Sequence, residues 1–92
     1  MTFTNILMGY SVILTNNAQK DLQKLPTNVI VIIKKKLAQL TQETHNLNIL
    51  KLMGYAKPTY RLRAGDYRII FEIFEREIIV LVIGIKHRKD AY

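Results

Sequence analysis

The sequence predicts one α+β domain with the element order β-α-α-β-β-β, in which two N-terminal helices pack on one face of a small, mainly antiparallel sheet. The 92 residues are enough for one domain and too few for two. Apolar residues at helical spacing follow a short β-branched run in the first half of the chain, and strand-like runs fill the chain from residue 60 onward. Helices and strands segregated in this way are typical of the α+β class.

The first strand and the first helix are predicted within residues 10–25. The run YSVIL, residues 10–14, is short, apolar and β-branched, which indicates a strand. In the segment TNNAQKDLQKL that follows, Asn16 and Gln19 resemble a helix capping box, and Pro26 ends the helix. We expect a single domain over residues 10–92, preceded by residues 1–9 as an N-terminal extension of little structural importance, open to disorder.

A second helix is predicted over residues 28–43, with Thr27 as its cap and apolar residues at spacings of three and four. The consecutive lysines Lys34–Lys36 point in different directions around this helix, which favours a solvated face over a nucleic-acid site. Residues 44–58 are expected to form an irregular loop, polar at first and then basic, with His45 on the surface.

The segment YRLRAGDYRII, residues 60–70, predicts a β-hairpin whose two-residue loop is Gly65-Asp66. This loop fixes the register, because residues on either side of it must face each other in order. The pairs Ala64–Tyr67, Leu62–Ile69 and Tyr60–Phe71 then share the face that turns toward the core. On the other face Arg63 lies opposite Arg68, and Arg61 lies opposite Ile70.

The arginines on this hairpin indicate an anion site. Like charges placed directly across a ladder are destabilising, so a purely structural sheet is expected to avoid the Arg63–Arg68 pair. Asp66 and Glu72 are the carboxylates available to neutralise the cluster, and two carboxylates cannot satisfy three arginines with paired hydrogen bonds. Guanidinium groups bind phosphate oxygens in this paired geometry, which makes a phosphate group the expected ligand.

The last strand, residues 78–86, is apolar on both faces, so its register is not evident from its pattern. A three-residue turn, Glu75–Glu77, would place Gly84 opposite Arg68 and would turn Lys86 and Arg88 toward the arginine side. A two-residue turn would place both cations in the core, which favours the first register. The tail KHRKDAY would then bring His87, Arg88 and Tyr92 to the rim of the basic face.

Composition narrows the classes of function. Fourteen Lys and Arg against seven Asp and Glu give a net charge of +7, which suits a polyanionic partner and suits solubility equally well. The chain has no cysteine and two histidines, so we expect no disulfide, no metal site and no cofactor. It shows no secretory signal and no apolar run long enough for a membrane helix, so we expect a cytoplasmic protein without a membrane partner.

The motifs LQKLP, LKLMGYAKPTYRLRAGDYRIIFEI and IGIKHRKDAY together resemble the RelE/ParE superfamily of toxin-antitoxin toxins, over nearly the whole chain from Tyr10. The resemblance implies a RelE-like, microbial-ribonuclease-like fold and cytoplasmic action. It also implies a cognate antitoxin that wraps the toxin's surface, with DNA contacted only indirectly through the antitoxin complex. The RelE branch cleaves mRNA in the ribosomal A site, which inhibits translation and growth, so the ribosome and mRNA are further expected partners.

The resemblance to the RelE branch also implies residue roles. Cleavage would proceed by attack of a ribose 2′-hydroxyl on the adjacent phosphate, and the cations would stabilise the charge that develops. The candidate catalytic residues are Arg61, Arg63, Arg68, His87, Arg88 and Tyr92. The candidate RNA-binding residues are Lys51, Lys57, Lys86 and Lys89.

The acid and the base of this reaction stay open. Arginine cannot serve as the base. His87 is a candidate because imidazole titrates near neutrality, and it can equally be an exposed tail residue. Tyr92 can stack on a base, take part in proton transfer or cover the end of the chain. Some relatives carry a glutamate that pairs with a histidine, and no glutamate here corresponds to it.

Two other functions are compatible with the sequence. A toxin of the ParE branch would inhibit DNA gyrase by binding and would have no nuclease activity, and the GDYRI segment fits that branch as well. The concentration of arginines with a terminal tyrosine favours the nuclease. The third alternative is a basic RNA-binding or regulatory module without toxicity.

Overall fold

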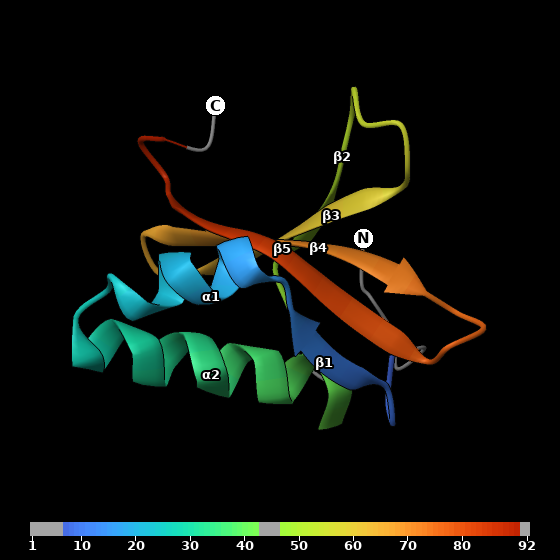
Figure 1. The fold of residues 1–92 in the computed structure, drawn as a ribbon, viewed down its shortest axis with the longest axis horizontal. Helices are drawn as coiled ribbons and strands as arrows, with labels where there is room; N and C mark the ends of the chain where they lie inside the picture. The colour runs from blue at the N-terminus through green and yellow to red at the C-terminus, as the bar shows by residue number, and fades with distance from the viewer. Residues whose placement is uncertain (1–6, 43–46, 91–92) are drawn as a thin grey trace.

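The computed structural model describes residues 7–42 and 47–90. A five-stranded sheet with the strand order β1-β5-β4-β3-β2 carries both helices on one face (Figure 1). The elements are β1 (Ser11–Leu14), α1 (Asn16–Gln23), α2 (Thr27–Gln42), β2 (Ile49–Leu52), β3 (Thr59–Ala64), β4 (Tyr67–Phe74) and β5 (Ile79–His87). β1 pairs with β5 in parallel, and the other neighbouring strands are antiparallel. The predicted α+β class is confirmed.

One strand of this sheet was not predicted. The segment 44–58 was expected to be a loop, whereas its residues Ile49–Leu52 form β2 and pair antiparallel with β3. The strand is short and lies at the edge of the sheet, and two of its four residues are exposed. His45 lies outside the described residues.

The two helices follow the prediction closely, with a shift of one residue at the start of each, since Thr27, the predicted cap of the second helix, is the first helical residue of α2. The N-cap is Thr15, one residue before the predicted Asn16, and its Oγ1 accepts a hydrogen bond from the Ala18 N–H at 3.1 Å. Threonine satisfies one of the N–H groups that the first turn leaves without a helical partner. Pro26 separates the helices, as expected.

The core lies between the helices and the sheet. Buried side chains of α2, among them Ile33 and Leu37, pack against the central strands, where Leu62, Ile69 and Phe71 are fully buried. Leu7 also belongs to this core and is only 1% exposed. The predicted boundary at residue 10 was therefore too late for Leu7, and residues 1–6 of the expected extension lie outside the described residues.

The predicted hairpin register is confirmed at every pair. Ala64 pairs with Tyr67, Leu62 with Ile69 and Tyr60 with Phe71, and the other face pairs Arg63 with Arg68 and Arg61 with Ile70. Gly65 begins the loop with a φ of 61°, as the first central residue of a type II′ turn requires. The two-residue loop was thus sufficient to set both faces of the hairpin.

The register of β5 differs from the prediction. The turn after β4 is one residue longer than expected, because Phe74 pairs with Ile79. A β-bulge then follows, since Ile70 pairs with Gly84 while Phe71 pairs with Val82, so that Ile83 is the extra residue. Lys86 consequently pairs with Arg68, in the place predicted for Gly84. The expectation that Lys86 shares a face with the arginines is confirmed.

The face of the sheet opposite the helices carries the arginines. In Figure 1 α2 lies below the central strands, whereas the β2–β3 connection and residues 88–90 after β5 rise above them. We call this helix-free side the open face. No helix in the described part of the chain is long and apolar enough to cross a membrane.

Candidate functional site

Three cations lie side by side across the open face. Arg68 on β4 is flanked by Arg63 on β3 and by Lys86 on β5, each in direct register with it. Side chains at such positions are close neighbours, roughly 5 Å apart at Cβ, and like charges there repel. We call these three residues the cationic row.

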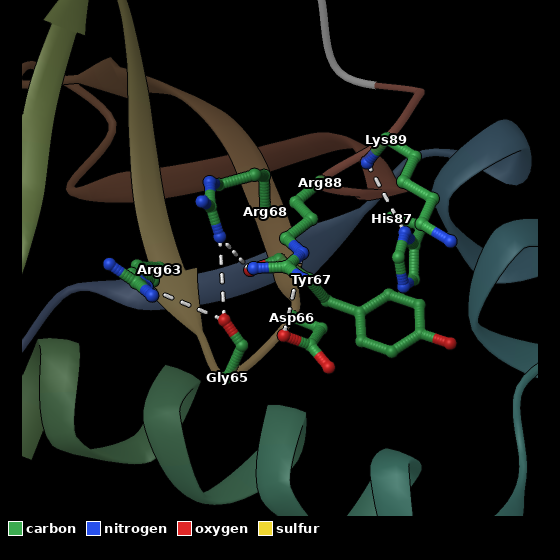
Figure 2. A network of polar contacts seen from close by, with 8 residues as sticks. All are labelled: Arg63, Gly65, Asp66, Tyr67, Arg68, His87, Arg88 and Lys89. Carbon is green, nitrogen blue, oxygen red and sulfur yellow. Dashed lines mark hydrogen bonds and ion pairs between the residues drawn. The ribbon is translucent and has the colours of Figure 1, made fainter.

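The two arginines of the cationic row converge on one backbone oxygen. The Gly65 carbonyl accepts hydrogen bonds from Arg63 Nε and from Arg68 Nη1, each at 3.4 Å (Figure 2). Arg68 Nη1 also donates to the Tyr67 carbonyl at 3.3 Å. Arg68 is only 8% exposed, and its buried Nε has no hydrogen-bond acceptor among the described residues. The hairpin turn thus holds both guanidinium groups with long, neutral hydrogen bonds.

The carboxylates near this site contact Arg88 and Lys86, and not the two arginines of the cationic row. Asp66, in the hairpin turn, lies 3.7 Å from Arg88 Nε, and Asp21 of α1 lies 3.7 Å from Lys86 Nζ. Within the described ranges 7–42 and 47–90, no carboxylate lies within 4.0 Å of Arg63 or Arg68. The compensation by Asp66 that the sequence left open is therefore absent for these two arginines, and their charge is available to an anion.

Arg61 extends the basic surface by one pair along β3. It lies opposite Ile70 on one side and Leu50 of β2 on the other. Its Nη2 donates to Asn48 Oδ1 at 2.8 Å, and the Asn48 carbonyl accepts from the Arg63 N–H at 3.0 Å. Asn48 was not singled out in the sequence, because its role depends on the strand β2 that follows it.

His87 lies away from the cationic row. It pairs with Tyr67, a residue that packs against the core, and the two rings meet edge to face with centroids 5.2 Å apart (Figure 2). Its Nδ1 accepts a hydrogen bond from the Lys89 N–H at 3.2 Å. The alternation of β5 turns His87 toward the helix side and its neighbour Lys86 toward the open face. The expected position of His87 on the rim of the basic face is thus wrong.

The structure describes the rest of the predicted tail as far as Asp90. Arg88 is fixed at the end of the hairpin, because its N–H donates to the Asp66 carbonyl at 2.7 Å in addition to the side-chain ion pair. Lys89 follows in an exposed turn. Tyr92 lies outside the described residues.

The other predicted RNA-binding lysines do not gather at this site. Lys51 pairs with Tyr60, which places it on the helix side of the edge strand β2. Lys57 lies at the opposite end of the hairpin, with its Nζ 5.9 Å from the centroid of the Phe74 ring. Of the four lysines, Lys86 alone stands in register with the arginines among the described residues. In that same part of the chain, no group of three or more metal-ligating side chains could hold an ion.

Comparison with known proteins identifies the family of this basic, helix-backed sheet. A family model described as the ParE toxin of the type II toxin-antitoxin system parDE matches residues 12–92. The chain is a toxin of the RelE/ParE superfamily. The match includes every strand and helix from the second residue of β1 onward, so the resemblance noted in the motifs extends over the fold.

Relatives of the toxin carry RelE-type names. Toxin RelG of Mycobacterium tuberculosis is 30% identical over 87 residues, which cover 92% of this chain and 98% of RelG. The mRNA interferase toxin RelE of Escherichia coli is 28% identical over 88 residues, covering 92% of each chain. The toxin-antitoxin complex RelBE2 of Mycobacterium tuberculosis contains a chain with a TM-score of 0.78 and 25% identity, covering 94% of this toxin and 99% of that chain. The toxin is therefore RelE-like in sequence and in fold.

Proposed function

We propose that this toxin is a ribosome-dependent mRNA endonuclease that cleaves the message in the A site and so inhibits translation and growth. The observation that carries the proposal is the cationic row, Arg63, Arg68 and Lys86, in which the two arginines have no carboxylate within 4.0 Å among the described residues. Adjacent uncompensated cations on a sheet are unfavourable unless an anion joins them. The mRNA interferase activity named for the E. coli relative supports the same reaction.

The reaction needs stabilisation of charge more than it needs a nucleophile from the protein. The 2′-oxygen of one ribose attacks the adjacent phosphorus and loses its proton, while the bond from phosphorus to the 5′-oxygen breaks and that oxygen gains a proton. The products are a cyclic phosphate and a 5′-hydroxyl. Negative charge grows on the phosphoryl oxygens on the way, and Arg68, Arg63 and Lys86 are suited to receive it because cations held in place stabilise such a transition state.

The position of His87 and the chemistry of arginine both bear on which group transfers the protons. His87 faces Tyr67 on the helix side, so it is a poor candidate for contact with a phosphate at the cationic row. Arginine does not deprotonate in proteins. A toxin with few acid and base groups of its own is suited to a substrate that the ribosome orients, because positioning alone can supply a large part of the rate.

The toxin is also proposed to act in the cytoplasm and to be neutralised there by a cognate antitoxin. Solved structures of relatives are toxin-antitoxin complexes, among them RelBE2 of Mycobacterium tuberculosis and RelBE of Escherichia coli. The net charge of +7 suits an acidic antitoxin segment as well as RNA.

The second candidate function is inhibition of DNA gyrase without nuclease activity. It is favoured by the family match, since the model that covers residues 12–92 is described as a ParE toxin. The cationic row has no evident part in that function.

The two candidates separate in one set of assays with the purified toxin. Primer extension on a defined mRNA, with and without programmed ribosomes, is expected to show cleavage only with ribosomes and at the A-site codon. A gyrase supercoiling assay is expected to show no inhibition. Intact mRNA in both conditions, together with inhibited supercoiling, would overturn the nuclease in favour of the ParE-type function.

A further inference from the structure

The open face contains a groove beside the cationic row that no predicted role accounts for. Its volume is about 290 Å³, and it is lined by Tyr55, Ile70, Ile83, Gly84, Lys86 and Asp90. Tyr55 belongs to the β2–β3 connection, and Asp90 belongs to the turn after β5. These two segments rise on the open face in Figure 1, so the groove runs between them over β4 and β5.

The floor of the groove is apolar and adjoins the cationic row. Ile70 pairs with Gly84, one step along the sheet from the pair of Arg68 and Lys86. Residues two apart on a strand are roughly 7 Å apart. Within a nucleotide, the phosphate and the base are separated by a similar span. A phosphate held at the cationic row therefore places its base, or the next one, over this floor.

Tyr55 is positioned as an aromatic wall of this groove. It is 54% exposed, and it makes no hydrogen bond or ring contact within the described part of the chain. Gly54, with a φ of 86°, provides the turn that precedes it. An exposed tyrosine ring beside an apolar floor and a row of cations fits a planar aromatic ligand that carries negative charge.

We infer that Tyr55 is a stacking platform for one nucleobase of the RNA that crosses the cationic row. The inference rests on the proposed function and adds a base-binding residue outside the predicted catalytic and RNA-binding sets. Stacking on an aromatic side chain accepts every base, because each base has a π-face. Tyr55 thus contributes affinity and position for the strand, while Lys86 and Asp90 also line the groove.

The test uses a short single-stranded RNA that carries 2-aminopurine, whose fluorescence is quenched when the base stacks. The fluorescent base is moved through the sequence one position at a time. At one position, the wild-type toxin and Tyr55→Phe are expected to quench the emission, because stacking needs the ring and not the hydroxyl. Tyr55→Ala is expected to lose that quenching and to bind the RNA roughly tenfold more weakly.

Met53→Ala is the matched control, because Met53 is 87% exposed in the same connection and does not line this groove. It is expected to quench and bind like the wild type. Equal quenching by the wild type and Tyr55→Ala at every position would overturn the inference, whether or not the toxin cleaves mRNA. A Tyr55→Ala toxin that binds RNA normally and escapes its antitoxin would assign the groove to the antitoxin and would overturn it as well.

Cleavage on programmed ribosomes gives a second, independent measurement. Tyr55→Ala is expected to cut roughly tenfold more slowly at low toxin concentration, and an abasic nucleotide at the stacked position is expected to remove the difference between the variant and the wild type. A difference that persists with the abasic message would contradict stacking. Absence of cleavage by the wild type would instead count against the endonuclease, and the fluorescence result would still decide the role of Tyr55.

Discussion

Arg63 and Arg68 face each other across β3 and β4 and donate to the same carbonyl oxygen, that of Gly65, each at 3.4 Å. A carbonyl oxygen is a neutral acceptor, so it does not cancel the charge of either guanidinium group. The hairpin therefore brings two fixed positive charges together at its turn, at the expense of stability.

The first prediction concerns the charge of Arg68. Arg68→Met keeps an apolar stem in a position that is 8% exposed and removes the charge. We expect cleavage of ribosome-bound mRNA to fall by about 100-fold or more, as when a group that stabilises a transition state is lost. The free energy of unfolding is expected to change by less than about 1 kcal/mol, because the lost hydrogen bonds offset the relieved repulsion. Primer extension and urea unfolding measure the two effects.

Arg76→Met is the matched control for this substitution. Arg76 is exposed in the turn between β4 and β5, away from the hairpin turn, and its replacement makes the same change in net charge. It is expected to cleave like the wild type. A folded Arg68→Met toxin with wild-type cleavage would show that the cationic row is not the reaction centre.

The second prediction uses Arg63, which is exposed and lies opposite Arg68. Arg63→Glu replaces a repulsive cross-strand pair with an attractive one, so the free energy of unfolding is expected to rise by roughly 0.2–1 kcal/mol. Cleavage is expected to fall, because the new carboxylate then accepts hydrogen bonds from the Arg68 guanidinium in place of the phosphate. Arg63→Gln removes the repulsion without adding attraction. Its urea midpoint should therefore lie between those of the wild type and Arg63→Glu. A less stable Arg63→Glu protein would contradict the assumed repulsion.

The third prediction concerns Asp21, which covers an open edge of β5. β1 pairs only with Ile79–Val82, and beyond that point the Ile85 N–H donates to Asp21 Oδ2 at 3.0 Å. Asp21→Ala leaves this N–H without an acceptor, which costs about 1–3 kcal/mol. We expect the low end, since Asp21 is 22% exposed. Urea unfolding measures the total loss of unfolding free energy, and hydrogen exchange at the Ile85 amide shows whether the loss arises at this contact.

Asp21→Asn keeps a side-chain oxygen that can accept the same hydrogen bond. Its stability and the protection of the Ile85 amide are expected to stay close to those of the wild type. Equal losses for the alanine and asparagine variants would mean that the ion pair with Lys86, at 3.7 Å, matters more than the backbone contact.

The fourth prediction is the dependence of RNA binding on salt. Each phosphate contact with a single strand contributes about −0.7 to the slope of log K against log salt concentration. If Arg68 holds a phosphate, Arg68→Met is expected to make the slope less steep by about 0.7, whereas Arg76→Met leaves it unchanged. Fluorescence anisotropy over a series of salt concentrations measures the slopes. Identical slopes for the wild type and Arg68→Met would exclude a direct phosphate contact at Arg68.

The hairpin was predictable from the sequence because its loop is short and its faces differ. Gly65-Asp66 allows one tight register, and the alternation of apolar and basic residues assigns each side chain to a face. The helices were predictable for a similar reason, since their apolar residues recur at helical spacing and Pro26 marks the break between them.

The last strand was not predictable in the same way. Residues 79–85 are apolar except for Gly84, so neither the four-residue turn nor the bulge at Ile83 leaves a pattern in the sequence. The position of His87 depends on that bulge. β2 was missed because four residues at an edge give a weak signal, which consisted of the segment ILKL, apolar except for Lys51. The place of Tyr55 depends on how the connection after β2 folds over the sheet.

The bulge at Ile83 also determines how β5 tolerates changes in length. Before it, Val80 and Val82 point to the core, and after it Ile85 does so, although the spacing from Val82 to Ile85 is odd. Deleting Ile83 would leave a regular strand with Lys86 still opposite Arg68. Deleting Ile85 would also allow a regular strand with Lys86 opposite Arg68, but Gly84 would then take the buried place of the Ile85 side chain. A loss of one residue in β5 is therefore expected to be tolerated at the bulge, whereas two positions further along the chain the same loss removes a buried side chain from the core.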